Sequence, residues 1–173
     1  LMNPGMKENG GIFMHIQGWA VMAETMLGNG NRAYEYFRAY MPAAYNNKAE
    51  IREIEPYVLC QSTHSKFSPR YGASRIPWLT GSATWTMVAA TQYILGIKPV
   101  ADGLLIDPCI PTEWESFTVK RRFRGKIFEI QVRNPRHSSK GVKTILLNGE
   151  KIEGSMIPFD RASSLNYVTV EMV

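Results

Sequence analysis

The chain has 173 residues, 45% hydrophobic and 20% charged, a globular composition that argues against intrinsic disorder. No apolar run approaches the roughly 20 residues needed to cross a bilayer and no secretory signal opens the chain, so we expect a cytoplasmic protein without a membrane partner. The net charge of +5 allows an anionic partner but does not choose among phosphate, other small anions and polyanions.

The chain starts at Leu1 without an initiator Met, so we expect that this is not a natural start. Its two cysteines, Cys60 and Cys109, lie far apart, without a CxxC pair or a histidine at metal-ligand spacing. This spacing predicts neither a disulfide framework nor a zinc site. We therefore expect no metal and no cofactor, and a reducing compartment.

The first 41 residues predict two amphipathic helices. Apolar residues recur at helical spacing over 19–27 and again over 33–41. Gly28 is expected to end the first helix and Asn31 to cap the second. Because the link between them is so short, the two helices should be antiparallel neighbours.

Residues 43–80 show no sustained period and are predicted to form a long loop. Loops of this length inside compact domains are usually functional or disordered. The aromatic side chains of Tyr57, Phe67, Tyr71 and Trp78 argue against disorder, because such rings can anchor a loop to a packed surface.

A third helix is predicted to begin near Ser82 and to end at Gly96. Apolar residues occupy nearly all of its sides, which indicates a helix that lies between neighbours. Three helices are too few to surround it. We therefore expect further helices upstream in a longer protein, or else an oligomer, such as a dimer, that covers the apolar faces.

After Pro99 the apolar spacing changes to two, which predicts strands. The alternation is clear over 117–123 and 128–132, and Asn148-Gly149 is a type I′ hairpin signal. A last strand is expected around Val168. The fold class predicted from these patterns is α+β, with helices followed by antiparallel strands.

Two short segments before helices could bind an anion. His15 follows paired glycines at the start of the first helix, and Thr80-Gly81-Ser82 precedes the third helix in the same way. Each has a plainer alternative. His15 could be a buried ring bonded to a backbone carbonyl, and Thr80 or Ser82 could simply cap the helix.

Hydrogen-bonding side chains are concentrated between Gln61 and Lys66, as in loops that line sugar or phosphate sites, although a solvated loop has the same composition. Glycosidic bond hydrolysis needs a pair of carboxyl groups, and three lie at Glu50, Glu53 and Glu55. Glu50 and Glu53 fit a charged surface turn. Glu55, beside Pro56-Tyr57, is less easily dismissed.

The densest basic run spans residues 120–126. On one continuous strand, Lys120, Arg122, Arg124 and Lys126 would share a face, as in a nucleic-acid-binding surface. The alternative is a solvent-facing strand whose charges prevent aggregation. We favour the alternative and expect no nucleic-acid partner, because no known nucleic-acid-binding motif accompanies the run.

Taken together, three blocks resemble the carboxy-terminal part of glycoside hydrolase family ninety-four, which contains disaccharide phosphorylases. The blocks are GIFMHIQGWAVMAETMLGNGNRAYEYFRAYMPAAYN, EIEPYVLCQSTHSKFSPRYGASRIPWLTGSATWT and QYILGIKPVADGLLIDPCIPTEWESFTVKRRFRG. The resemblance runs from about residue 3 to about residue 135, and it rests on the order and spacing of the blocks. It implies that residues 1–98 are the last helices of an (α/α)6 catalytic barrel and that 99–173 form a β-sandwich-like carboxy-terminal domain.

The resemblance also implies roles for single residues. By position, the family's phosphate contacts fall on His15, Gln61, Thr80 and Gly81, and its sugar contacts fall on Lys7 and Glu8. Met14 and Ile16 depart from the family pattern beside His15, which puts the specificity for the acceptor sugar in doubt.

The activity so implied is inverting phosphorolysis of a β-linked disaccharide, cellobiose or N,N′-diacetylchitobiose, to an α-sugar 1-phosphate and a free sugar. Inorganic phosphate is the co-substrate. The general acid and the phosphate-clamping arginines would lie upstream, so this chain is expected to contain no catalytic residue and to be inactive alone. The alternative is a non-catalytic carbohydrate-binding or interaction module.

Overall fold

The computed structural model describes residues 2–173, which form two compact units. The first unit comprises the residues up to 22 together with 35–89, and the second comprises 23–34 and 90–173. The helices found in the described part of the chain are all too short or too polar to traverse a bilayer. The same residues contain no group of three or more His, Cys, Asp or Glu side chains that could hold a metal ion.

The two predicted amphipathic helices are confirmed as α1 (His15–Met26) and α2 (Gly30–Tyr40). Gly28, with a φ of 83°, ends α1 as expected, because glycine adopts this left-handed conformation at little cost. The predicted cap at Asn31 is wrong. The helix already includes Asn31, and its side-chain oxygen accepts a hydrogen bond from the backbone N–H of Thr112, at 2.8 Å.

The segment predicted as a long loop contains regular structure. It forms a 3₁₀ helix η1 (Pro42–Lys48), a short helix α3 (Ala49–Arg52) and strands β2 (Cys60–Thr63) and β3 (Ser74–Pro77). With β1 (Ile12–Phe13), these strands make an antiparallel sheet in the order β1-β2-β3. The strands escaped prediction because sequences as polar as Gln61-Ser62-Thr63 carry no hydrophobic alternation.

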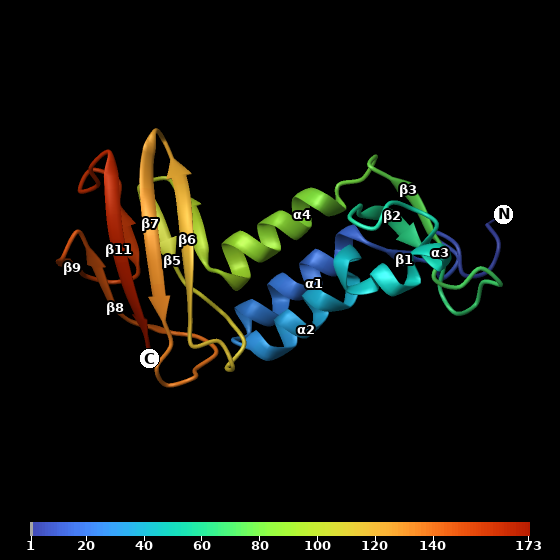
Figure 1. Ribbon diagram of the computed structural model, residues 1–173, viewed down its shortest axis with the longest axis horizontal. Coiled ribbons are helices and arrows are strands. Elements are labelled where there is room, and N and C mark those ends of the chain that lie inside the picture. The colour runs from blue at the N-terminus through green and yellow to red at the C-terminus, as the bar shows by residue number, and fades with distance from the viewer. Residues whose placement is uncertain (1) are drawn as a thin grey trace. The chain divides into compact units, whose positions relative to one another are not determined.

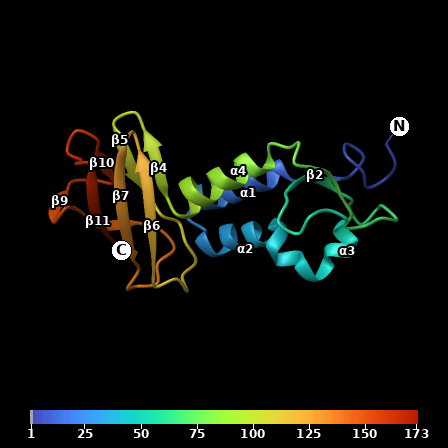
Figure 2. The same ribbon diagram turned by 45° about the horizontal axis from the view of Figure 1, so that its top comes forward.

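The third helix begins as α4 (Ser82–Val88) and continues as the π-helical turn η2 (Ala89–Ile94), and Gly96, with a φ of 67°, follows its end. α4 lies beside α1 (Figures 1 and 2), and the rings of Trp19 and Trp85 meet edge to face at 5.5 Å. Met87 of α4 is 64% exposed, which leaves an apolar side chain open to the upstream helices or the second copy expected from the sequence. The position of this helix between neighbours therefore stays a prediction.

The second unit holds two sheets. Their strands are β4 (Ile97–Val100), β5 (Gly103–Ile106), β6 (Ser116–Phe123), β7 (Lys126–Arg133), β8 (Val142–Leu147), β9 (Glu150–Ile152), β10 (Met156–Pro158) and β11 (Leu165–Met172). One sheet has the order β10-β5-β4 and the other β6-β7-β11-β8-β9. The predicted α+β class and the run of strands after Pro99 are therefore confirmed, whereas the expectation of helices alone in the first hundred residues is wrong, because β1, β2 and β3 lie there.

The expectation of purely antiparallel strands is wrong at one place. β11 enters between β7 and β8 and pairs with β7 in parallel, as Figures 1 and 2 show, while the other strand pairs are antiparallel. The alternating apolar residues of β7 and β11, including Phe128, Val132 and Val170, are almost completely buried. Burial of these side chains is the main force that stabilises this sheet.

The basic stripe does not form. β6 ends at Phe123, and Arg124 and Gly125 make the turn with φ values of 48° and 80°. Lys126 therefore opens the next strand, where its ammonium donates hydrogen bonds to the backbone carbonyls of Phe159 and Ala162. The nucleic-acid interpretation loses the four-residue face on which it depended.

Candidate functional site

Strand β2 brings together the three sequence blocks that carry the predicted phosphate contacts. The backbone N–H of Met14, next to His15, donates a hydrogen bond of 2.9 Å to the carbonyl of Gln61. The hydroxyl of Ser82, next to Gly81, donates one of 3.0 Å to the carbonyl of Cys60. Residues more than 60 positions apart in sequence are thus tied to adjacent residues of one strand.

His15 is the first residue of α1, and its ring is partly exposed. It contacts Trp19 edge to face at 5.5 Å and Phe13 at 6.0 Å. A partly exposed ring does not fit the alternative of a buried histidine bonded to a backbone carbonyl. The two aromatic neighbours instead restrict the orientation of an imidazole that can still reach a ligand.

The side-chain amide of Gln61 projects from β2 and is half-buried. Its Oε1 atom is buried and has no hydrogen-bond partner among the residues described. A buried amide oxygen without a partner costs roughly 1–3 kcal/mol, so such a group commonly meets a ligand or water. Half a turn of the amide presents an N–H at the same point, and an N–H is the group that a phosphate oxygen would accept from.

Thr80 lies in the turn before α4 and is hydrogen-bonded to Ser82. Its hydroxyl accepts a hydrogen bond from the backbone N–H of Ser82 and donates one to the Ser82 hydroxyl, both at 3.2 Å. The plainer interpretation of Thr80 or Ser82 as the helix cap is wrong, because the N-cap residue of α4 is Gly81 and no side chain caps the helix there. Gly81 is exposed, so a ligand could approach its backbone without meeting a side chain.

Lys7 and Glu8 lie in a tight turn of the first unit. The Gly5 N–H donates to the Asn9 carbonyl at 2.8 Å, and the Gly11 N–H donates to the Lys7 carbonyl at 2.9 Å. Within the described residues, no hydrogen bond or ion pair joins the side chains of Lys7 or Glu8 to the predicted phosphate contacts. The turn is connected to β2 through the segment that follows this strand, because the N–H of Ser65 donates a hydrogen bond to the carbonyl of Gly5.

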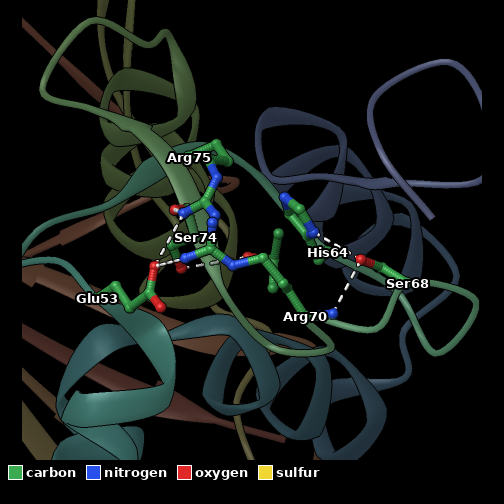
Figure 3. A network of polar contacts seen from close by, with 7 residues as sticks. Glu53, His64, Ser68, Arg70, Ser74 and Arg75 are labelled. Atoms are coloured by element: carbon green, nitrogen blue, oxygen red, sulfur yellow. Dashed lines mark hydrogen bonds and ion pairs between the residues drawn. The ribbon is translucent and has the colours of Figure 1, made fainter. Parts of the chain in front are cut away.

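Two of the carboxylates considered from the sequence, Glu53 and Glu55, have lowered pKa values. The Glu53 carboxylate accepts hydrogen bonds from Arg70 and Arg75 (Figure 3), which lower its pKa. Hydrogen bonds from its own backbone and from the indole of Trp78, at 3.1 Å, lower the pKa of Glu55. A general acid must be protonated near neutral pH, so neither side chain fits that role.

Sequence reasoning missed the importance of His64. Only 3% of this residue is exposed, and its Nδ1 atom lies 2.8 Å from the hydroxyl oxygen of Ser68 (Figure 3). Its Nε2 atom is buried without a partner among the described residues. Burial lowers the pKa of His64, and Arg75 and Arg70 lower it further, whereas Glu53 has the opposite effect.

The low pKa of His64 predicts a pH dependence of stability. The unfolded chain takes up a proton at this histidine as the pH falls through about 6.5, while the folded chain takes it up only at lower pH, so the free energy of unfolding falls in that window. Urea unfolding measured between about pH 7 and pH 5 should show this fall. His64→Asn should flatten it, and an equally steep profile in that variant would assign the effect to other groups.

The first unit also contains a cavity of about 430 Å³. Its lining includes Tyr36, Tyr40, Tyr45, Tyr71 and Arg52. None of the six residues predicted to bind phosphate or sugar contributes to this lining, although Met14, next to His15, and Thr63, also on β2, do. The cavity therefore borders strand β2 but is not lined by His15, Gln61, Thr80 or Gly81, the four residues that we call the cluster on β2.

Comparison with known proteins gives two family matches. Residues 1–96 match the Glycosyl hydrolase 94 superfamily, catalytic domain, and residues 97–153 match the Glycosyl hydrolase family 65, C-terminal domain. Over 96% of its length the chain is 45% identical to an N,N′-diacetylchitobiose phosphorylase of Vibrio proteolyticus and 43% identical to one of Vibrio furnissii. Over 98% it is 32% identical to a solabiose phosphorylase of Paenibacillus borealis. The chain spans only 20–22% of the length of these relatives.

Proposed function

Since the chain belongs to the glycosyl hydrolase 94 superfamily, we propose that it is the carboxy-terminal part of an inverting disaccharide phosphorylase. In this proposal residues 1–98 complete the (α/α)6 catalytic barrel and 99–173 form the β-domain. The whole protein acts in the cytoplasm, with inorganic phosphate as co-substrate and no further cofactor.

The cluster on β2 carries the proposal. His15, Gln61, Thr80 and Gly81 make one wall of the phosphate site, because each lies on or beside the backbone that is hydrogen-bonded to β2. The partly exposed imidazole of His15 and the unpartnered amide of Gln61 supply the polar atoms. Lys7 and Glu8 bind the sugar, and the rest of the site comes from other parts of the protein.

The reaction is a single displacement. A phosphate oxygen attacks the anomeric carbon, the bond from that carbon to the glycosidic oxygen breaks, and a carboxylic acid protonates the leaving oxygen. One carboxyl group is sufficient, because phosphate takes the place of the water that a second carboxylate activates in inverting hydrolases. The ionised state of Glu53 and Glu55 supports a general acid from outside this chain.

For the disaccharide, we propose N,N′-diacetylchitobiose in preference to cellobiose. Two relatives at 45% and 43% identity carry that substrate in their names. The alternative of a non-catalytic carbohydrate-binding module required aromatic side chains spaced on one sheet face. Most of the exposed aromatic side chains, such as Tyr57, Tyr71 and Trp78, instead belong to the first unit.

Incubation of the full-length protein with N,N′-diacetylchitobiose and phosphate tests this function. We expect N-acetylglucosamine α-1-phosphate and free N-acetylglucosamine in equal amounts, and no cleavage when phosphate is omitted. The 173-residue chain alone should yield no sugar phosphate. Release of two free sugars without phosphate would identify a hydrolase and overturn the proposal.

A further inference from the structure

We propose that His64 is a positioning residue, which holds the Lys7–Glu8 turn in register with strand β2 and thereby sets the affinity for the sugar. This inference rests on the proposed function. His64 itself is not among the residues predicted to bind phosphate or sugar. Its support lies in the hydrogen bonds between β2, the segment 64–73 and the residues around Gly5.

His64 fixes both ends of the segment that follows β2. Its backbone N–H donates to the carbonyl of Ala73 at 2.8 Å, and its carbonyl accepts from the N–H of Gly72 at 3.0 Å. These two bonds close the segment 64–73 into a loop. The loop therefore begins three residues after Gln61 and cannot move independently of β2.

The imidazole then sets the shape of this loop from inside. The Ser68 hydroxyl oxygen lies 2.8 Å from Nδ1 of His64 and accepts the backbone N–H of Arg70 at 3.1 Å. The guanidinium of Arg70 in turn binds the carboxylate of Glu53 (Figure 3). The loop is thus held at Ser68 by the His64 ring and at Arg70 by the ion pair with Glu53. Of these two contacts, the one made by the His64 ring is closed to solvent.

The residues that lead into the Lys7–Glu8 turn are hydrogen-bonded to this loop. The N–H of Ser65 donates to the carbonyl of Gly5 at 3.0 Å. A Cβ atom on Gly5 would lie only 2.5 Å from the backbone nitrogen of Ser68, so these two backbones are in direct contact. A displacement of Ser68 toward Gly5 therefore shifts Gly5, and Lys7 is only two residues further along the chain.

Neutral imidazole suits this role because it is rigid and can form a single directed bond while buried. The low pKa that burial and the two arginines impose keeps His64 uncharged. An asparagine can place its amide where Nδ1 lies, whereas an alanine cannot. His64→Asn therefore removes the ring but keeps the hydrogen bond, whereas His64→Ala removes both.

Steady-state kinetics of the full-length protein test the proposal with His64→Ala, Ser68→Ala and His64→Asn. We expect the two alanine variants to raise KM for the disaccharide by about tenfold, since misplacement of a binding group by less than 1 Å is sufficient for such a loss. KM for phosphate should change less than about twofold, because the N–H of Met14, next to His15, stays hydrogen-bonded to the carbonyl of Gln61. His64→Asn should restore most of the affinity for the sugar.

His137→Asn is the matched control, because the exposed ring of His137 also makes a single Nδ1 contact, 2.9 Å from the carbonyl of Thr112, but in the second unit. It should leave both KM values unchanged. Equal rises in the two KM values, or no rescue by His64→Asn, would reduce His64 to a structural residue and overturn the inference. Absence of phosphate-dependent cleavage in the unmodified protein would instead refute the proposed function.

If His64→Ala does not fold, hydrogen exchange of the His64→Asn and Ser68→Ala proteins decides the same point. Exchange at the amides of Gly5 and Asn9 should accelerate in Ser68→Ala and stay close to that of the unmodified protein in His64→Asn. Unchanged exchange in Ser68→Ala would show that the turn does not depend on this loop.

Discussion

His15→Ala in the full-length protein is expected to lower kcat/KM for phosphate by about 100-fold, the usual loss when one donor that stabilises the reacting anion is removed. The partly exposed ring makes aromatic contacts only to Phe13 and Trp19 in the described residues, so its removal should have little effect on folding. Initial rates at varied phosphate and saturating disaccharide measure the effect.

Two further variants make this test specific. His137→Ala removes an exposed histidine from the second unit and should leave kcat/KM for phosphate unchanged. Gln61→Ala should reproduce most of the loss seen with His15→Ala, because both residues are assigned to one wall. If His15→Ala raised KM for the disaccharide and left the phosphate parameters unchanged, the assignment of this wall to phosphate would be wrong.

Asn166→Asp is expected to destabilise the second unit by about 3 kcal/mol, although the two side chains have the same shape. Asn166 is completely buried, and its Nδ2 donates to the carbonyls of Ile127 and Ser163 at 3.0 and 2.8 Å. Its Oδ1 accepts the N–H of Ser163 at 2.8 Å. An aspartate keeps the acceptor but turns a carboxylate oxygen toward two carbonyls, which leaves buried acceptors without donors.

Urea unfolding at pH 7 measures this loss as a lower midpoint at constant slope. The exposed Asn47 provides the control, since Asn47→Asp introduces the same charge without removing a buried bond and should change stability by less than about 0.5 kcal/mol. Similar midpoints for the two variants would contradict the importance assigned to the Asn166 contacts.

The parts of the fold with strong periodicity could be predicted from the sequence. The helices at His15 and Gly30 and the hairpin at Asn148-Gly149, whose φ values are 51° and 89°, follow from apolar spacing and turn chemistry. The sheet β1-β2-β3 could not be predicted, because its strands are short, show no sustained apolar alternation and depend on partners distant in sequence. The parallel pairing of β11 with β7 could not be predicted either, because it depends on the path of the chain between distant strands and not on any local pattern.

The candidate site, too, could be predicted only where local sequence patterns mark it. The glycines and polar groups around His15 and Thr80 suggested anion contacts, and the family resemblance assigned them to phosphate. That both segments are joined to β2 depends on bonds to the carbonyls of Gln61 and Cys60, which no local pattern reveals. His64 was noted only as one of several polar residues in a loop, because its burial is a consequence of tertiary packing.

A crystal structure of the full-length protein with bound phosphate tests the central claim most directly. We predict phosphate oxygens within about 3.2 Å of His15, the Gln61 amide and the Thr80–Gly81 segment, which is hydrogen-bonding distance. Lys7 and Glu8 should lie beside the sugar when disaccharide is also bound. Phosphate bound by other residues, with His15 and Gln61 out of hydrogen-bonding reach, would contradict the account.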